Sequence, residues 1–340
     1  MRGTVLIALA AGLIAAVVFL SATTGPLPMR LVLFLLTPLS LFLAGLGWGW
    51  ISALVGGITG TIAIAFVTTP AIGAVFAISQ AVPVVVLTYL AMLNRPAPAP
   101  GPDVDPVTRT EWYPVGRIVV WAASLSGAMA LAAMFMVGPD IDSLKTAIRK
   151  LIEEVLKAQL EAMAGGKPMS EDDITRLADV GVYLLPALTA LSWMMTMLLN
   201  LWLAGRITLA SGRLARPWPD IPAMRFPRGT PLVLAAASAA TFLPGYAALG
   251  ASALSGAFYF AYVLMGLAVI HFVTRGQPWR PIALWSLYGA LMILNTGISI
   301  FIAILGLADG FIPLRRGQNR PPGGGPQAPP GGPPPTLPPQ

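Results

Sequence analysis

The most charged stretch of the chain is DIDSLKTAIRKLIEEVLKAQLEAMAGGKPMSEDDITRLAD, residues 140–179. On both sides of it the sequence consists mainly of long uncharged apolar runs, over residues 4–137 and 181–308. An α-helix needs about 20 predominantly apolar residues to cross the hydrocarbon core of a bilayer. The sequence therefore predicts an all-α, polytopic membrane protein in which a charged insert separates two hydrophobic halves.

The insert is expected to fold into two helices. Over residues 141–163, apolar side chains recur at helical spacing and form one stripe, with charged side chains on the opposite face. Asp140 or Asp142 can cap the start of this first helix. Ser170 and Asp173 have the spacing of a capping box, which predicts a second helix that continues without a break into the next membrane span.

The apolar stripe of the first insert helix must be buried, and the sequence leaves three environments open for it. The helix can lie flat in the lipid interface. It can instead act as a lid that caps a cavity between the two hydrophobic halves. It can also pair with a helix of a partner protein.

Composition narrows the possible chemistry. The chain has 340 residues, of which 56% are hydrophobic and 10% are charged. It contains no cysteine and one histidine, His271, which excludes disulfides, thiolate metal sites and clusters of several histidines within one chain. We therefore expect no metal and no cofactor. The net charge of +7 comes largely from arginines that flank the spans, so it does not indicate binding of nucleic acid.

The apolar runs predict about nine transmembrane helices. Their expected bounds are residues 4–22, 31–46, 50–67, 72–93, 115–137, 181–204, 231–249, 252–273 and 281–308. The chain thus divides into an N-terminal half (1–138), the insert (139–180), a C-terminal half (181–310) and a tail (311–340). The tail is rich in proline and glycine, which predicts a disordered, polyproline-like segment.

Arginines in the loops indicate the orientation of the spans. The loop of residues 206–228 contains five arginines, which favours a cytoplasmic location for it and for the N-terminus. The insert then lies on the periplasmic side of a bacterial inner membrane. Arg315, Arg316 and Arg320 oppose this topology, because nine spans would place them outside the cell.

Small residues predict where two of the spans turn and pack. The glycine-rich stretch of residues 45–49, with tryptophans between the glycines, marks a turn at the membrane surface between the second and third spans. After it, Ser52, Gly56 and Gly60 form a row of small residues at four-residue spacing. Such rows allow helices to pack closely in lipid.

No Asp, Glu, Lys or Arg lies well inside a predicted span, so we expect the protein not to be an enzyme. Neutral polar and aromatic residues remain. Pro83 cannot donate a hydrogen bond, so it frees the carbonyl of Ser79, beside Gln80. The residues predicted to line a pocket for a small, largely uncharged ligand are Gln80, Trp193, Asn200, Tyr259, Tyr262, Trp285, Tyr288, Asn295 and Ser299. Alternatively, these side chains only form hydrogen bonds between helices.

The order of these features resembles the YybS-like family of predicted bacterial membrane proteins, over residues 1–310. The likeness rests on the Ala-rich first span, the charged insert and three stretches: GLGWGWISALVGGITG (45–60), EWYPVGRIVVWAASLSG (111–127) and LLPALTALSWMMTMLLNLWLAGRI (184–207). That family is similar in turn to the substrate-binding S-components of energy-coupling-factor vitamin transporters.

The resemblance implies a partner as well as a function. In S-components an A-x-x-x-A face of the first helix contacts a transmembrane coupling subunit that works with ATPases, and Ala11 and Ala15 are the matching positions. We therefore expect a non-enzymatic component of small-solute uptake that partner subunits energise. The rival expectation is a membrane scaffold or assembly factor, whose insert and Pro-rich tail recruit other proteins.

Overall fold

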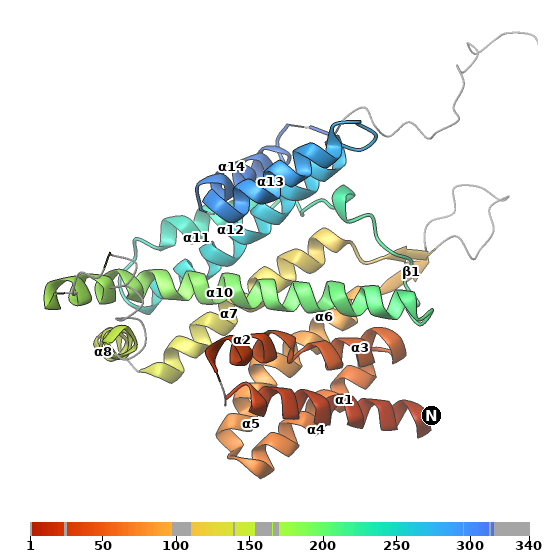
Figure 1. Cartoon of the computed structure of the whole chain (residues 1–340), viewed down its shortest axis with the longest axis horizontal. Coiled ribbons are helices and arrows are strands. Elements are labelled where there is room, and N and C mark those ends of the chain that lie inside the picture. The colour runs from red at the N-terminus through yellow and green to blue at the C-terminus, as the bar shows by residue number, and fades with distance from the viewer. Residues whose placement is uncertain are drawn as a thin grey trace, which may run out of the picture.

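The computed structural model describes residues 2–23, 26–96, 110–138, 140–153, 165, 170–294, 296–312 and 314–315. These residues form a bundle of α-helices with one short β-hairpin, which confirms the all-α class (Figure 1). Within them, seven helical segments are long and apolar enough to cross a membrane, and two further apolar helices are shorter. The predicted count of nine spans is therefore not confirmed.

The first half of the chain contains four helical spans, a hairpin and a fifth span. Its elements are α1 (Arg2–Ser21), α2 (Leu27–Leu36), α3 (Leu39–Trp48), α4 (Trp50–Val67), α5 (Pro70–Phe76), the π-helix η1 (Ala77–Ala81), α6 (Val82–Met92), β1 (Asn94–Pro96), β2 (Thr110–Trp112) and α7 (Val115–Val137). The rest of the chain contains α8 (Ile141–Leu151), α10 (Glu171–Ala210), the 3-10 helix η4 (Ile221–Ala223), α11 (Thr230–Ala240), α12 (Tyr246–Val273), α13 (Arg280–Leu294) and α14 (Thr296–Ala308).

A single residue joins the second and third spans. Gly49 lies between Trp48, the last residue of α3, and Trp50, the first residue of α4, and it has a φ of +95°. Residues with a Cβ atom rarely adopt a positive φ, because the Cβ atom clashes with the backbone, whereas glycine adopts it without steric cost. The reversal occurs within the glycine-rich stretch that predicted it.

A seam of small residues joins α1 to α4. A Cβ atom added at Gly56 would lie 2.9 Å from the carbonyl oxygen of Ala8. One added at Gly60 would lie 2.9 Å from the carbonyl oxygen of Gly12. Ser52, the remaining member of the predicted row, is also buried. At Gly56 and Gly60 the two backbones therefore approach each other so closely that a side chain larger than hydrogen does not fit.

The face of α1 that was expected to contact a coupling subunit is buried inside the chain. Ala11 is 7% exposed and Ala15 is 0% exposed. The hydroxyl of Ser40 in α3 donates a hydrogen bond to the carbonyl oxygen of Ala11 at 2.9 Å. The expectation of a partner contact at Ala11 and Ala15 is thus corrected, because packing of α1 within the chain already occupies both positions.

α10 bridges two breaks in the N-terminal spans. Pro83 has no N–H for the carbonyl of Ser79, and the indole Nε1 of Trp193 donates to that carbonyl at 2.9 Å. In the last turn of α2, the carbonyl of Leu35 accepts a hydrogen bond of 2.7 Å from the amide Nδ2 of Asn200. The last carbonyls of a helix lack partners within that helix, and unpaired carbonyls are costly in lipid. These two side chains of α10 therefore stabilise both breaks.

The same helix joins the two halves of the molecule. α10 has 40 residues and is about 60 Å long, twice the roughly 30 Å of a bilayer's hydrocarbon core. It starts at the predicted capping box of Ser170 and Asp173 and continues without a break, as expected. It packs against α3, α6, α7 and α12 as well as α8. One hydrophobic core therefore contains residues from both predicted halves.

The insert packs on the N-terminal end of α10. Figure 1 shows α8 nearly end-on while α10 runs across the picture. Leu144 and Ile148 of α8 form a small separate core with Ile174 and Val182 of α10 and Leu249 of α12. Most of the described part of the apolar stripe is thus buried within the chain, although Leu151 is 41% exposed. The remainder of the expected first insert helix, residues 154–163, lies outside the described residues.

The predicted seventh span, residues 231–249, is not a single helix. α11 ends at Ala240, and a turn containing Gly245, with a φ of +71°, leads into α12. α11 has 11 residues, too few to cross the hydrocarbon core, which needs about 20.

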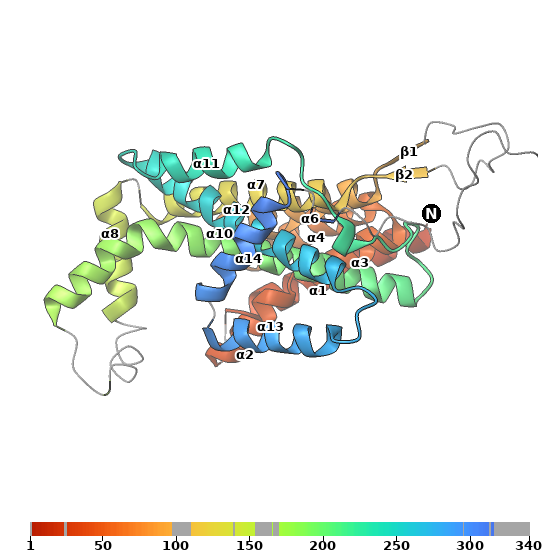
Figure 2. The same ribbon diagram turned by 90° about the horizontal axis from the view of Figure 1, so that it is seen from above.

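The predicted ninth span, residues 281–308, consists of two helices instead of one. The chain enters α13 and leaves α14 at the same end of the bundle. α13 and α14 meet at an angle (Figure 2). Before α13, Arg275 forms an ion pair with Asp220 in the loop of residues 211–229, called the arginine loop below. After α14, Arg315 donates a hydrogen bond of 2.9 Å to the carbonyl of Pro222 in the same loop. Both ends of the segment therefore lie beside the arginine loop.

This re-entrant course removes the conflict in the predicted topology. Arg315 lies at the arginine-loop end of the bundle, not at the opposite end. Arg316 and Arg320, like the rest of the tail to residue 340, lie outside the described residues. Among the described arginines none then opposes the positive-inside rule, and the cytoplasmic location of the arginine loop stays a prediction.

We predict that Gly56→Leu destabilises the protein, because the added side chain meets the backbone of α1. Overpacking of this kind costs about 1–3 kcal/mol. Gly3→Leu is the matched control, since a Cβ at Gly3 would meet no atom within 4 Å. Thermal unfolding in detergent, followed by size-exclusion chromatography, should show a lower midpoint for Gly56→Leu alone. Equal midpoints would contradict the seam.

Cysteine labelling tests the re-entrant segment in a chain that has no native cysteine. We expect Ser211→Cys and Leu314→Cys to react with a membrane-impermeant reagent from one side of the membrane, and Lys150→Cys to react from the other. If residues 281–308 cross the membrane as one span, Leu314→Cys will instead react from the same side as Lys150→Cys.

Candidate functional site

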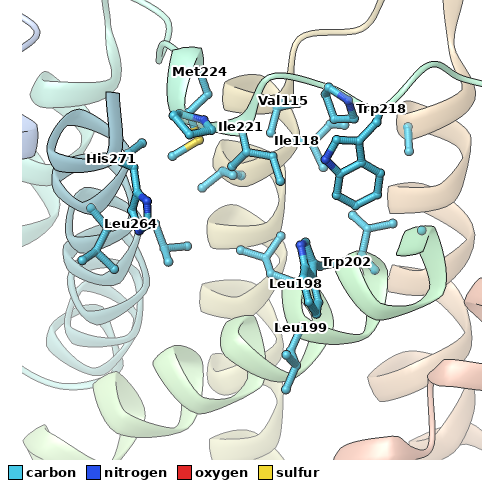
Figure 3. Close-up of a pocket in the computed structure, with 18 of the residues that line it drawn as sticks. Val115, Ile118, Leu198, Leu199, Trp202, Trp218, Ile221, Met224, Leu264 and His271 are labelled. Atoms are coloured by element: carbon cyan, nitrogen blue, oxygen red, sulfur yellow. The ribbon is translucent and has the colours of Figure 1, made fainter. Parts of the chain in front are cut away.

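A cavity of about 650 Å³ lies beneath the arginine loop, between α7, α10 and α12. In Figure 3, His271 and Trp218 stand on opposite sides of it, with side chains of α10 below and of the arginine loop above. The lining residues labelled there are Val115, Ile118, Leu198, Leu199, Trp202, Trp218, Ile221, Met224, Leu264 and His271. The cavity falls within the range of about 300–1,000 Å³ that is typical of small-molecule sites.

The floor of the cavity is one face of α10. Met195, Leu198, Leu199, Trp202 and Gly205 line it and recur every three or four residues, so they lie on one side of the helix. Over this stretch the helix rises by about 15 Å, which gives the cavity a long apolar wall.

Arg216 holds the arginine loop over the cavity from the side of the N-terminal half. Its Nη1 donates to the carbonyl of Ala91 in α6, and its Nη2 donates to the carbonyl of Tyr113, just before α7, both at 3.0 Å. Arg216 is only 9% exposed, and its burial lowers the pKa of the guanidinium from its ordinary value.

Two further arginines hold the loop from the side of the C-terminal half. Arg275 donates to Asp220 through Nη1 at 2.7 Å, and this hydrogen bond lowers the pKa of the carboxyl group of Asp220. Arg315 is buried, forms an ion pair with Asp309 and donates to the carbonyl of Met224 at 2.9 Å. The loop is thus a fixed roof over the cavity.

Trp218 fits into the roof because Gly205 leaves room for it. A Cβ atom at Gly205 would lie 3.3 Å from Cζ3 of the Trp218 ring. The guanidinium of Arg206 lies 5.1 Å from the centre of the same ring, within the range of a cation–π interaction.

The cavity opens sideways, toward the surroundings of the bundle. Three of its floor residues, Met195, Leu199 and Trp202, are 45%, 42% and 48% exposed. They lie on a helix that is long and apolar enough to span a membrane, so we expect lipid on this side of the cavity. Tyr288 of α13 stands at another edge, where its hydroxyl shares a hydrogen bond of 2.7 Å with Nε2 of His271.

The structure does not gather the predicted polar residues into one pocket. Of that set Tyr288 alone lines the cavity. Trp193 and Asn200 bond to carbonyls at the helix breaks, and the hydroxyls of Tyr259 and Ser299 bond to each other at 2.6 Å.

The remaining members of the predicted set lie apart from the cavity. Tyr262 is buried beside Phe226, whereas Trp285 is 81% exposed on α13. Asn295 lies outside the described residues. Gln80 is 0% exposed, and its amide oxygen and nitrogen have no hydrogen-bond partner among the described residues.

Sequence reasoning missed the residues that shape the cavity most, namely Trp202, Trp218, Arg216 and His271. From the sequence, His271 stands out only as the single histidine of the chain and the arginines only as a topology signal. The stretch RPWP, residues 216–219, is the signal that could have indicated them, because it places a tryptophan between prolines in a loop bordered by membrane spans. No group of three or more potential metal ligands occurs among the described residues.

We predict opposite effects for two of the sequence-predicted ligand residues. Trp193→Phe removes the donor to the carbonyl of Ser79 and should destabilise the protein by about 1–3 kcal/mol. Gln80→Met removes two unpaired polar atoms at similar volume, so it should be neutral or stabilising. Thermal unfolding of both variants in one detergent is the measurement. A comparable loss of stability in Gln80→Met would show that the amide of Gln80 has a partner in the membrane.

The comparisons with known proteins give a family and no activity. No curated protein and no solved structure is significantly similar to the chain. The narrower resemblance to YybS-like proteins and S-components stays a prediction. One family model matches residues 13–310, which is most of the chain and includes every helix that contributes to the cavity. The chain belongs to the family of predicted membrane proteins DUF2232, whose function is unknown.

Proposed function

We propose that this protein is a non-enzymatic binding component of a membrane transport system, and that its cavity takes up an apolar or amphipathic small molecule from the bilayer. The observation that carries this proposal is the cavity itself, which has a volume of about 650 Å³ and is covered by the arginine loop. Its apolar walls suit a molecule that already dissolves in lipid.

The shape of the cavity favours this ligand over a strongly hydrophilic solute. A water-soluble ligand would have to pass the roof, which three arginines hold in place. A lipid-soluble ligand would enter beside Met195 and Leu199, through the exposed side. The polar groups in the lining, such as Arg216 and His271, would orient it.

Transport also requires a source of energy, which this family would obtain from partner subunits in the inner membrane. Ala11 and Ala15 are buried and do not offer a surface for such a subunit. α13 offers one, because Ile282, Trp285 and Met292 are 72%, 81% and 89% exposed. The same surface also suits the rival function, a scaffold that recruits membrane proteins without binding a solute.

Mass spectrometry of the protein purified in mild detergent tests the proposal. We expect a lipid-soluble small molecule to co-purify at near-stoichiometric amounts. Leu198→Trp should fill the cavity and reduce the bound amount several-fold, since Leu198 lines it.

Leu188→Trp is the matched control on the same helix, because Leu188 is 46% exposed and does not line the cavity. It should retain the ligand. Co-purification of partner proteins without any small molecule, unchanged in Leu198→Trp, would favour the scaffold and reject the binding function.

A further inference from the structure

We propose that the ligand of the cavity is an anionic amphiphile, with a carboxylate or phosphate head group at Arg216 and an apolar chain along α10 toward the bilayer. This inference rests on the proposed binding function and specifies its ligand. Three observations carry it: the unpaired charge of Arg216, the gradient of polarity along the cavity, and the excess of arginine around the roof.

Among the three arginines that hold the roof, Arg216 differs in its partners. Arg275 is paired with Asp220 and Arg315 is paired with Asp309. Arg216 has no carboxylate partner among the described residues, and its two hydrogen bonds go to neutral carbonyls. It nevertheless lines an apolar cavity.

A buried charge without a counter-charge is costly, so Arg216 favours an anion. A guanidinium has five N–H donors, and the carbonyls of Ala91 and Tyr113 use two of them. The carbonyl of Ala91 lies in the last turn of α6, where the helix dipole supplies roughly half a negative charge. The negative end of the α6 dipole therefore offsets part of the positive charge of Arg216. A carboxylate or phosphate would complete the compensation through strong, charge-assisted hydrogen bonds.

The polarity of the lining changes along the cavity in the direction that an amphiphile requires. Arg216 belongs to the roof, in the loop that follows the C-terminal end of α10. From Trp202 to Met195 the floor is apolar and exposed on the side that faces lipid. A single-chain amphiphile could thus leave its head under the roof while its chain remains in contact with the hydrocarbon core.

Further arginines near the roof raise the local concentration of anions. Arg206 lies against Trp218, and Arg213 lies over the ring of Trp48, 4.7 Å from its centre. No salt bridge to Arg206 or Arg213 occurs within the described part of the chain. Positive residues at the membrane surface attract anionic lipids and amphiphiles. The electrostatic field of these arginines brings anionic molecules to the opening of the cavity, although the arginines themselves do not contact the bound ligand.

The test compares three probes with the same saturated chain, a carboxylate, a phosphate monoester and an alcohol. Each is titrated into the full-length protein, stripped of lipid in a neutral detergent, while the tryptophan fluorescence of the protein is recorded. We expect at least one of the two anionic probes to bind at least about tenfold more tightly than the alcohol. A preference for the carboxylate indicates a fatty-acid-like ligand, and a preference for the phosphate indicates a lipid phosphate.

Variants assign the preference to Arg216. Arg216→Gln should reduce the anion-to-alcohol affinity ratio to near one, while the alcohol still binds. Arg30→Gln, which changes an arginine of α2 that neither lines the cavity nor lies near the roof, should keep the ratio. If Arg216→Gln does not fold, Arg216→Lys takes its place. Lysine keeps the charge but cannot form the paired hydrogen bonds of a guanidinium, so the anion-to-alcohol affinity ratio should be lower than in the wild-type protein, and an unchanged ratio would overturn the inference.

The outcomes separate this inference from the proposed function. Equal binding of the anionic and neutral probes by the wild-type protein would overturn the anionic ligand and leave a cavity for apolar molecules. An unchanged ratio in Arg216→Gln would also overturn it, because the charge that it invokes would play no part. Failure of all three probes to bind would reject the binding function itself.

Discussion

The structure depends on the rule that backbone carbonyls within a bilayer need hydrogen-bond partners. Two N-terminal spans are interrupted, one at Pro83 and one between α2 and α3, and lipid cannot supply the missing donors. Trp193 and Asn200 supply them from α10, at distances of 2.9 and 2.7 Å. Because both carbonyls belong to the first half of the chain and both donors to the second, this requirement fixes the halves against each other. The side chains that look most like a polar binding site are thus needed to hold the fold.

Arginine has two physical roles at one end of the bundle. Its charge is the basis for predicting that this end lies in the cytoplasm, and the planar guanidinium group donates to carbonyls and carboxylates of several elements at once. Within the arginine loop, Arg216 donates to a carbonyl of α6. From outside the loop, Arg275 donates to Asp220 and Arg315 donates to the carbonyl of Met224. A segment without regular secondary structure over most of its length therefore becomes a fixed cover.

The length of α10 separates the insert from the cavity. The insert packs near Ile174 and Val182, whereas the cavity floor extends from Met195 to Gly205. At 1.5 Å per residue, Val182 and Met195 are about 20 Å apart along the helix axis. The interpretation of the insert as a lid is therefore corrected for its described residues, because α8 and the cavity lie at opposite ends of the bundle.

The sequence by itself determined the features that depend on neighbouring residues. These include the all-α membrane class, the turn at Gly49, the capping box at Ser170 and the unbroken course of α10. Only the tertiary structure decided the cavity, the re-entrant pair α13 and α14, and the burial of Ala11 and Ala15. The reason is that lipid and the protein core are both apolar, so hydrophobic periodicity does not show which face of a spanning helix lies inside. That choice depends on contacts between α7, α10, α12 and the arginine loop, which lie far apart in the sequence.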